Sequence, residues 1–172
     1  FLSGGDAKQR EVMCFDAGDG KLLWQRAVAN VPGSPAVPPE IPDATGYAAS
    51  TMATDGRRAF GLFANGDLAA FKFDGALAWA KNIGVPKNMY GHASSLAIWP
   101  GKLVVQMDQD EGAPGGSKLL AFDCATGRLL WDRTKPTHGS WASPIIIEAA
   151  GRLQIITLAL PFVMSSSLAD GN

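Results

Sequence analysis

The residues best suited to chemistry lie in an acidic, glycine-containing stretch at positions 108–112. Asp108, Asp110 and Glu111 carry hard carboxylate oxygens of the kind that bind calcium, and Gly112 permits a tight turn around an ion. The stretch lacks the remaining ligand positions of an EF-hand loop, so a solvated acidic loop is the alternative. We predict no metal site, with these three carboxylates as the calcium candidates if one exists.

Two histidines and two aromatic residues are the other candidates, because such side chains serve in catalysis and in ligand stacking. They are His92, His138, Tyr90 and Trp141. A catalytic histidine needs a partner within hydrogen-bond reach, which the sequence does not identify. His92 aligns with Ser140 rather than with His138, which disfavours a shared metal. No nucleophile motif, phosphate loop or zinc-type Cys/His spacing occurs, so we predict no catalytic residue and assign no cofactor-binding residue.

The composition favours many short strands joined by turns. Only 18% of the 172 residues are charged, while 20 are glycine and 11 are proline. The formal net charge of −1 gives no basis for nucleic-acid binding, and no apolar run is long enough for a transmembrane helix. Cys14 and Cys124 occupy non-equivalent positions, so we expect no disulfide between them. The chain starts at Phe1 without a secretory signal and its first methionine is Met13, so we expect a processed or excised piece.

One short pattern occurs three times and organises the rest of the chain. An apolar run ends near an aspartate, a glycine turn follows, and a tryptophan comes four residues after the glycine. The aspartate can fold its carboxylate onto turn amides, and the glycine can adopt the positive φ of a hairpin. Three equivalent tryptophans favour packing between repeats over stacking on a ligand. The nine repeat residues are Asp16, Gly20, Trp24, Asp74, Gly75, Trp79, Asp123, Gly127 and Trp131.

Further turn signals divide the chain into four-stranded units. Gly46, Gly91 and Gly139 each precede a serine by four residues, and these serines are 45 and 48 residues apart. Four short strands in each period of about 45–55 residues are typical of propeller blades. We predict an all-β, partial β-propeller of about three to four blades, incomplete at both ends. The predicted units are the end of a blade at 1–31, blades at 48–86 and 92–135, and a truncated blade at 140–172.

Strands nearest the propeller axis should open these units. We expect them near Ala48–Thr54, Ala93–Trp99 and Trp141–Glu148, and we expect a loop over residues 3–10 after a strand end at the N-terminus. The proline-rich segment 27–47 should be a loop or a polyproline-like connector, because proline at that density excludes helix and central strand. Both a functional loop and a plain crossover between blades fit this segment.

The four-stranded topology also predicts which candidates share a face. Connections between blades lie at the same end of the sheets as the turn between the second and third strands. Tyr90, His92, His138 and Trp141 should therefore share a face with the acidic stretch 108–112. We predict that this face binds the protein's ligand or partner, because loops on a rigid scaffold commonly carry recognition.

At these repeats the chain resembles the pyrroloquinoline quinone (PQQ)-like β-propeller family. Phe-Asp-Ala-x-x-Gly-Lys-Leu-Leu-Trp at 15–24 and Ala-Phe-Asp-x-Ala-Thr-Gly-Arg-Leu-Leu-Trp at 121–131 resemble its repeat. Gly91-His-Ala-Ser-Ser95 and Trp141-Ala-Ser-Pro144 resemble its blade-opening segment. The resemblance covers nearly the whole chain and is specific for the fold. The family includes PQQ-dependent dehydrogenases and the propeller lipoprotein of the outer-membrane β-barrel assembly machinery.

The resemblance implies two functions from different classes. The family's dehydrogenases typically stack the quinone on a disulfide between adjacent cysteines and bind calcium through Glu, Asn and Asp, and this chain has no adjacent cysteines. We therefore expect a non-catalytic module for protein or ligand binding in the bacterial cell envelope or periplasm, working with the remaining blades of its parent and without a cofactor. The alternative is a fragment of a PQQ-dependent alcohol or sugar dehydrogenase, with PQQ and calcium as cofactors.

Overall fold

The computed structural model describes residues 1–113 and 115–172, and its regular elements are β-strands in four antiparallel sheets. Sheet 1 holds β1 (Leu2–Gly5), β2 (Arg10–Phe15) and β3 (Leu22–Ala27). Sheet 2 holds β4 (Ala53–Thr54), β5 (Arg58–Leu62), β6 (Asp67–Lys72) and β7 (Leu77–Asn82). Sheet 3 holds β8 (Ala97–Trp99), β9 (Lys102–Met107), β10 (Ser117–Asp123) and β11 (Leu129–Lys135). Sheet 4 holds β12 (Ile145–Ala149), β13 (Arg152–Ala159) and β14 (Phe162–Ser167).

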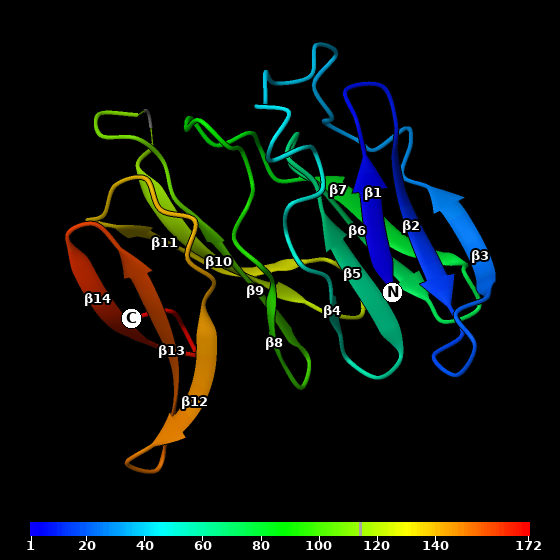
Figure 1. Cartoon of the computed structure of the whole chain (residues 1–172). Coiled ribbons are helices and arrows are strands. Elements are labelled where there is room, and N and C mark those ends of the chain that lie inside the picture. Colours follow the sequence, from blue (N-terminus) through cyan, green and yellow to red (C-terminus); the bar gives the residue numbers. More distant parts are fainter. Residues whose placement is uncertain (114) are drawn as a thin grey trace.

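The four sheets stand side by side in chain order along an arc that does not close into a ring (Figure 1). Within each sheet, neighbouring strands are also neighbours in sequence. This meander arrangement is that of propeller blades, so the predicted all-β, partial-propeller architecture is confirmed. Across the described residues there is no helix long and apolar enough to cross a membrane.

The strands that open sheets 2, 3 and 4 are shorter than predicted. β4 begins at Ala53, five residues later than expected, while β8 at Ala97 and β12 at Ile145 each begin four residues later. The preceding residues bond to the neighbouring sheet instead of pairing within their own. The Ser95 N–H, for example, donates to Ser143 Oγ at 3.0 Å. The opening strands of neighbouring sheets approach one another near the axis. There, hydrogen bonds that involve side chains replace part of the backbone pairing within each sheet.

The prediction of a loop over residues 3–10 is partly wrong. β1 extends to Gly5 and pairs with β2, with Leu2 opposite Met13. Two adjacent glycines weaken strand propensity, which is why the sequence suggested a loop. Tertiary packing reverses that preference, because a Cβ at Gly4 would lie only 3.2 Å from the Met13 Cε atom. A small residue is therefore favoured inside this strand.

Buried apolar side chains fill the space between neighbouring sheets. Val12 and Phe71 belong to the cluster between sheets 1 and 2, and Phe60 and Leu103 to the cluster between sheets 2 and 3. Ile155 of sheet 4 joins the cluster that it forms with sheet 3. The core therefore lies between sheets, which explains why the central strands are buried on both faces.

Each repeat tryptophan packs on the turn glycine of the next sheet. A Cβ on Gly75 would lie 3.1 Å from the Trp24 ring, and one on Gly127 would lie 2.7 Å from the Trp79 ring. These glycines also have positive φ values of 85° and 70°, which suit glycine and disfavour other residues. At Gly75 and Gly127, glycine is thus required twice, for the turn and for the close approach.

The repeat aspartates shape the turns that carry these glycines. Asp123 Oδ1 accepts hydrogen bonds from the Thr126 hydroxyl at 2.7 Å and the Thr126 N–H at 2.8 Å. The hydroxyl bond is the first cause that lowers the pKa of Asp123. Asp16 and Asp74 likewise accept hydrogen bonds from the N–H groups two residues ahead, at 2.8 Å and 2.9 Å. These carboxylates therefore hold the hairpins in shape.

Candidate functional site

The candidate residues lie at one end of the molecule, which we call the loop end. It is formed by connections between sheets, including residues 83–96 and 136–144, and by the β9–β10 and β13–β14 turns (Figure 1). The β4–β5, β8–β9, β10–β11 and β12–β13 turns lie at the opposite end, which we call the turn end. The molecule therefore has two end surfaces. Connections between sheets contribute to the loop end, whereas turns within sheets form the turn end.

His92 is a buried structural residue of the loop end. Its ring lies in the interior, with Nε2 2.8 Å from the Gly84 carbonyl oxygen. Burial lowers the pKa of His92 to about 4, although the contact with Gly84 acts in the opposite direction. At neutral pH the ring is uncharged, and its contact with Gly84 joins two parts of the same connection between sheets 2 and 3. It does not face a surface where a substrate could meet it.

Asp108 is also buried, and its carboxylate is fully engaged. Oδ1 forms an ion pair with Lys135 Nζ at 2.6 Å and lies 3.4 Å from the Thr137 hydroxyl. Oδ2 accepts a hydrogen bond from Gln106 Nε2 at 2.6 Å. Burial is the main cause that lowers the pKa of Lys135, while the negative charge of Asp108 acts against it. This carboxylate secures the end of sheet 3 from inside.

Asp110 and Glu111 differ from Asp108, because their side chains are exposed. They border a hollow of about 580 Å³ together with Lys87 and Met89. Among residues 1–113 and 115–172, no group of three or more histidines, cysteines or carboxylates is placed to hold a metal ion. A calcium ion bound by all three acidic residues of the stretch would have to displace Lys135 from Asp108.

Tyr90 and Trp141 are brought into direct contact, which the sequence did not predict. Their rings meet edge to face, with centroids 4.7 Å apart and planes at 77°. The Tyr90 N–H donates to Asn88 Oδ1 at 3.0 Å, and Asn88 Nδ2 donates to the Asp108 carbonyl at 2.7 Å. The aromatic pair therefore links the two connections that flank sheet 3 and is held in place by the β9–β10 turn.

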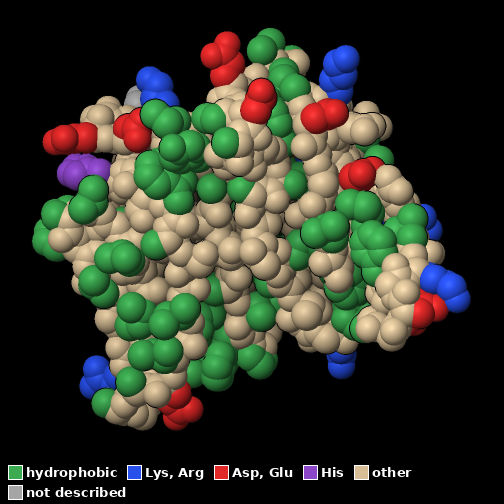
Figure 2. All heavy atoms as spheres, viewed as in Figure 1, with side chains coloured by type: hydrophobic (Ala, Val, Ile, Leu, Met, Phe, Trp, Pro, Cys, Tyr) green, Lys and Arg blue, Asp and Glu red, His purple; other side chains and the backbone are tan. Residues whose placement is uncertain are grey.

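The loop end also exposes apolar side chains, and Figure 2 shows hydrophobic atoms there beside acidic ones. Sequence reasoning named Trp141 as a candidate and missed Met89 and Leu160. Met89 is 62% exposed, Trp141 41% and Leu160 69%. Leu160 joins this group because its carbonyl accepts a hydrogen bond from the His138 N–H at 2.8 Å. In a sequence, an exposed apolar residue beside a turn cannot be told from the buried end of a strand. The folded structure is needed to show which of these side chains are exposed.

The described residues do not fit the PQQ and calcium sites that the resemblance implies. Cys14 lies in β2 and Cys124 in the β10–β11 turn, and both are free and buried, so they cannot form a disulfide of adjacent cysteines. Burial raises the pKa of Cys124 to about 12, which keeps the thiol protonated. The three acidic candidates for calcium do not converge, as described above. No chemical step through either group is derived from this chain.

The family follows from a sequence comparison that covers most of these sheets. Residues 3–152 match the profile of a PQQ repeat family described as "Outer membrane protein assembly factor BamB". The chain belongs to this family. A search of curated proteins found no match.

Solved structures agree with this PQQ repeat fold. A quinohemoprotein alcohol dehydrogenase of Pseudomonas putida HK5 superposes with a TM-score of 0.60 and 17% identity, over 98% of this chain and 31% of its own. BamB of Moraxella catarrhalis superposes with a TM-score of 0.52 and 14% identity, over 94% of this chain and 48% of its own. The chain thus spans from about a third to about half of these proteins. Likeness at this level of identity shows the fold alone.

Proposed function

We propose that this chain is a non-catalytic binding module of a bacterial cell-envelope protein, and that its loop end binds an apolar segment of a protein partner. The observation that supports this most is the contrast between buried polar groups and exposed apolar ones at that end. His92 and Asp108 are engaged in internal contacts, whereas Met89, Trp141 and Leu160 are exposed. Exposed apolar side chains at one end of a rigid frame suit protein recognition.

Neighbouring residues hold Trp141 in place. Its ring is held edge to face by Tyr90, whose backbone is fixed by Asn88. An aromatic residue that is held in place loses little side-chain entropy on binding, and such residues commonly supply much of the affinity of protein interfaces. Trp141 is therefore the expected anchor.

The family supports both the partner class and the location. The family description is that of an outer-membrane protein assembly factor, so we propose an envelope or periplasmic location and a protein partner. The test introduces a photo-crosslinking amino acid at Met89 or at Trp141 in the parent protein, expressed in its own cells. The control carries the same amino acid at Leu77, at the turn end. We expect one defined envelope protein to crosslink at the first two positions. Crosslinking at Leu77 alone, or a purely cytosolic parent, contradicts the proposal.

A second candidate is a fragment of a PQQ-dependent dehydrogenase. The observation in its favour is the superposition on a quinohemoprotein alcohol dehydrogenase over 98% of this chain. Its chemistry would depend on residues of the parent protein other than those described. Dye-coupled oxidation of an alcohol or sugar by the parent protein, dependent on added PQQ and calcium, would favour this candidate over the binding module.

A further inference from the structure

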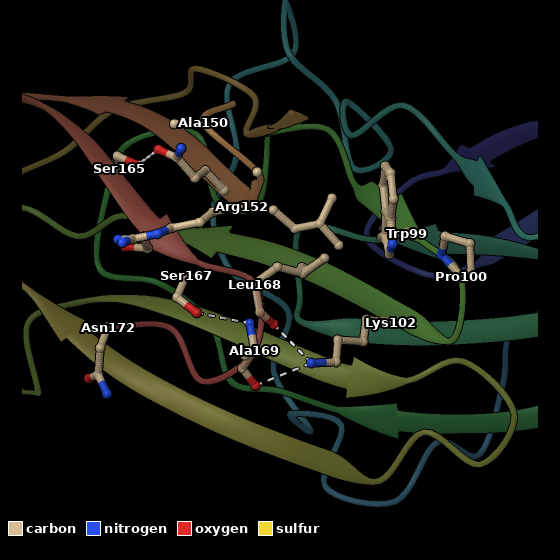
Figure 3. Close-up of a pocket in the computed structure, with 14 residues that line it drawn as sticks. Trp99, Pro100, Lys102, Ala150, Arg152, Ser165, Ser167, Leu168, Ala169 and Asn172 are labelled. Carbon is tan, nitrogen blue, oxygen red and sulfur yellow. Dashed lines mark hydrogen bonds between the residues drawn. The ribbon is translucent and has the colours of Figure 1, made fainter. Parts of the chain in front are cut away.

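Two equivalent grooves open at the turn end, and their charges differ. Groove 2–3 lies between sheets 2 and 3 and is bordered by the β4–β5, β8–β9 and β10–β11 turns. Groove 3–4, of about 770 Å³, lies between sheets 3 and 4 (Figure 3). It is bordered by the β8–β9 and β12–β13 turns and by the turn after β14. Each turn in one groove has a counterpart in the other, so the two can be compared position by position.

The charges of groove 2–3 are balanced. Its lining contains Arg57 and Arg58 as cations and Asp55 and Asp123 as anions. Arg58 pairs directly with Asp55, with Nη1 2.5 Å from Oδ2. An arginine that is already paired with a carboxylate has little left to offer an external anion.

Groove 3–4 keeps the cation and loses both acids. Lys102 opens β9 as Arg58 opens β5, but Trp99 stands where the first groove has Asp55. Ser167 replaces Asp123, since the backbone bond from Gly171 N to the Ser167 carbonyl repeats the bond from Gly127 N to Asp123. Arg152 adds a second cation from the β12–β13 turn. Among the residues that the structure describes, the groove lining therefore holds two cationic side chains and no aspartate or glutamate.

Neither cation of groove 3–4 is neutralised within the described residues, where no ion pair involves Lys102 or Arg152. Lys102 Nζ donates to the Leu168 and Ala169 carbonyls at 2.9 Å and 3.2 Å, which fixes its position and leaves one ammonium proton. Asp170, in the same turn, does not line the groove, and its carboxylate accepts hydrogen bonds from Asn172.

We propose that groove 3–4 binds a small organic anion, in which a carboxylate or phosphate group is joined to an aromatic body. Trp99 and Pro100 stand at one side of the groove, Arg152, Ser165 and Ser167 lie at the other, and Lys102 reaches between them (Figure 3). The cations supply charge-assisted hydrogen bonds to the anionic group, and the indole supplies a surface for the aromatic body. This site lies at the turn end and is independent of the partner surface proposed for the loop end.

Calorimetric titration of the purified chain with phenyl phosphate and with benzoate tests the proposal, with benzyl alcohol and inorganic phosphate as comparison ligands. We expect saturable binding of both aromatic anions and at least tenfold weaker binding of benzyl alcohol, which lacks the charge. Inorganic phosphate should bind at least fivefold more weakly than phenyl phosphate. No saturable binding of the aromatic anions, or equal binding of benzyl alcohol, would overturn the proposal.

The decisive variant is Ser167→Asp, which restores the acid that the equivalent turn carries. It suits the fold because Asp123 holds the same position in sheet 3. It should weaken phenyl phosphate binding at least fivefold with an unchanged melting temperature, and Arg152→Met should do the same. The matched control is Arg57→Met in groove 2–3, which should leave binding unchanged. An equal loss in Arg57→Met, or full binding by Ser167→Asp, would place the anion elsewhere and overturn the proposal.

Discussion

Trp79 and Trp131 occupy equivalent places in sheets 2 and 3, yet their indole N–H groups differ. Trp79 Nε1 donates to the Cys124 carbonyl at 3.0 Å. Trp131 Nε1 is buried and has no partner among the described residues. The carbonyl that corresponds to that of Cys124 belongs to Leu168, and it accepts a hydrogen bond from Lys102 Nζ at 2.9 Å. A repeat thus determines where a tryptophan packs, while one neighbouring side chain decides whether its polar atom is satisfied.

The donor at the Leu168 carbonyl is a charged ammonium rather than a neutral indole. A charged ammonium forms a stronger hydrogen bond than a neutral indole N–H, and Lys102 gains two carbonyl partners at once. A buried N–H without a partner costs about 1–3 kcal/mol. Both tryptophans still pack on the glycine of the next turn, since a Cβ on Gly171 would lie 2.8 Å from the Trp131 ring. Packing is therefore shared, and hydrogen bonding is not.

The largest expected effect is the loss of either ring. Trp79→Ala and Trp131→Ala should each lower the free energy of unfolding by about 3–5 kcal/mol, because each leaves a large cavity between two sheets. Urea unfolding followed by circular dichroism measures this. A cost below about 1 kcal/mol for either variant would show that the two tryptophans do not contribute equally to packing between sheets.

Acid should destabilise the connection between sheets 2 and 3, because it protonates His92. The connection between sheets 3 and 4 has Ser140 at the aligned position, and serine does not titrate. The pKa of His92 is about 4 in the folded chain and 6.5 as its ordinary value, so folding favours the neutral ring. This stabilisation is fully present above pH 6.5 and is lost as the pH falls toward 4, by up to about 3 kcal/mol.

The measurement compares urea unfolding at pH 7 and pH 4.5 for the natural chain and for His92→Gln. The variant should lose less stability in acid than the natural chain, because the remaining carboxylates titrate alike in both. Equal pH dependence in the two proteins would contradict a buried neutral His92.

Replacing the packed glycine by alanine should distinguish the cost of crowding the tryptophan ring from the cost of positive φ in the turn. Gly127→Ala should cost about 2–4 kcal/mol, because a Cβ would meet the Trp79 ring at 2.7 Å and φ is positive. Gly20→Ala is the matched control, since it has the same sign of φ but no atom within 4 Å of its Cβ position. The control should cost about 1 kcal/mol. Similar thermal melting of both variants would mean that the turn alone requires glycine.

The smallest effect isolates the N–H group. Trp79→Phe removes a donor and leaves the Cys124 carbonyl without it, whereas Trp131→Phe removes a donor that has no partner. We expect Trp79→Phe to cost about 1–2 kcal/mol more than Trp131→Phe. Chemical denaturation of the two variants side by side measures this difference. The opposite order would show that Trp131 Nε1 is satisfied in solution.

Prediction from sequence worked best where a residue acts on its neighbours in the chain. The repeat pattern located the β2–β3, β6–β7 and β10–β11 hairpins. It failed where the next sheet intervenes, as in the shortened β4, β8 and β12. For the candidate site, topology placed Tyr90 and Trp141 at one end, but only the folded structure brings their rings together. The burial of His92 and Asp108 had no signal in the sequence.

By itself, the sequence determined the repeat, the four-stranded units and the roles of the turn glycines, because these depend on local backbone geometry and on spacing. Tertiary structure alone decided which polar groups remain available. Asp108 meets Lys135, which lies 27 positions further along the chain, and Lys102 meets Leu168 from another sheet. Partners so far apart in the chain are set by how sheets pack. Among the described residues, this packing leaves Trp131 Nε1 without a partner and groove 3–4 without an aspartate or glutamate in its lining.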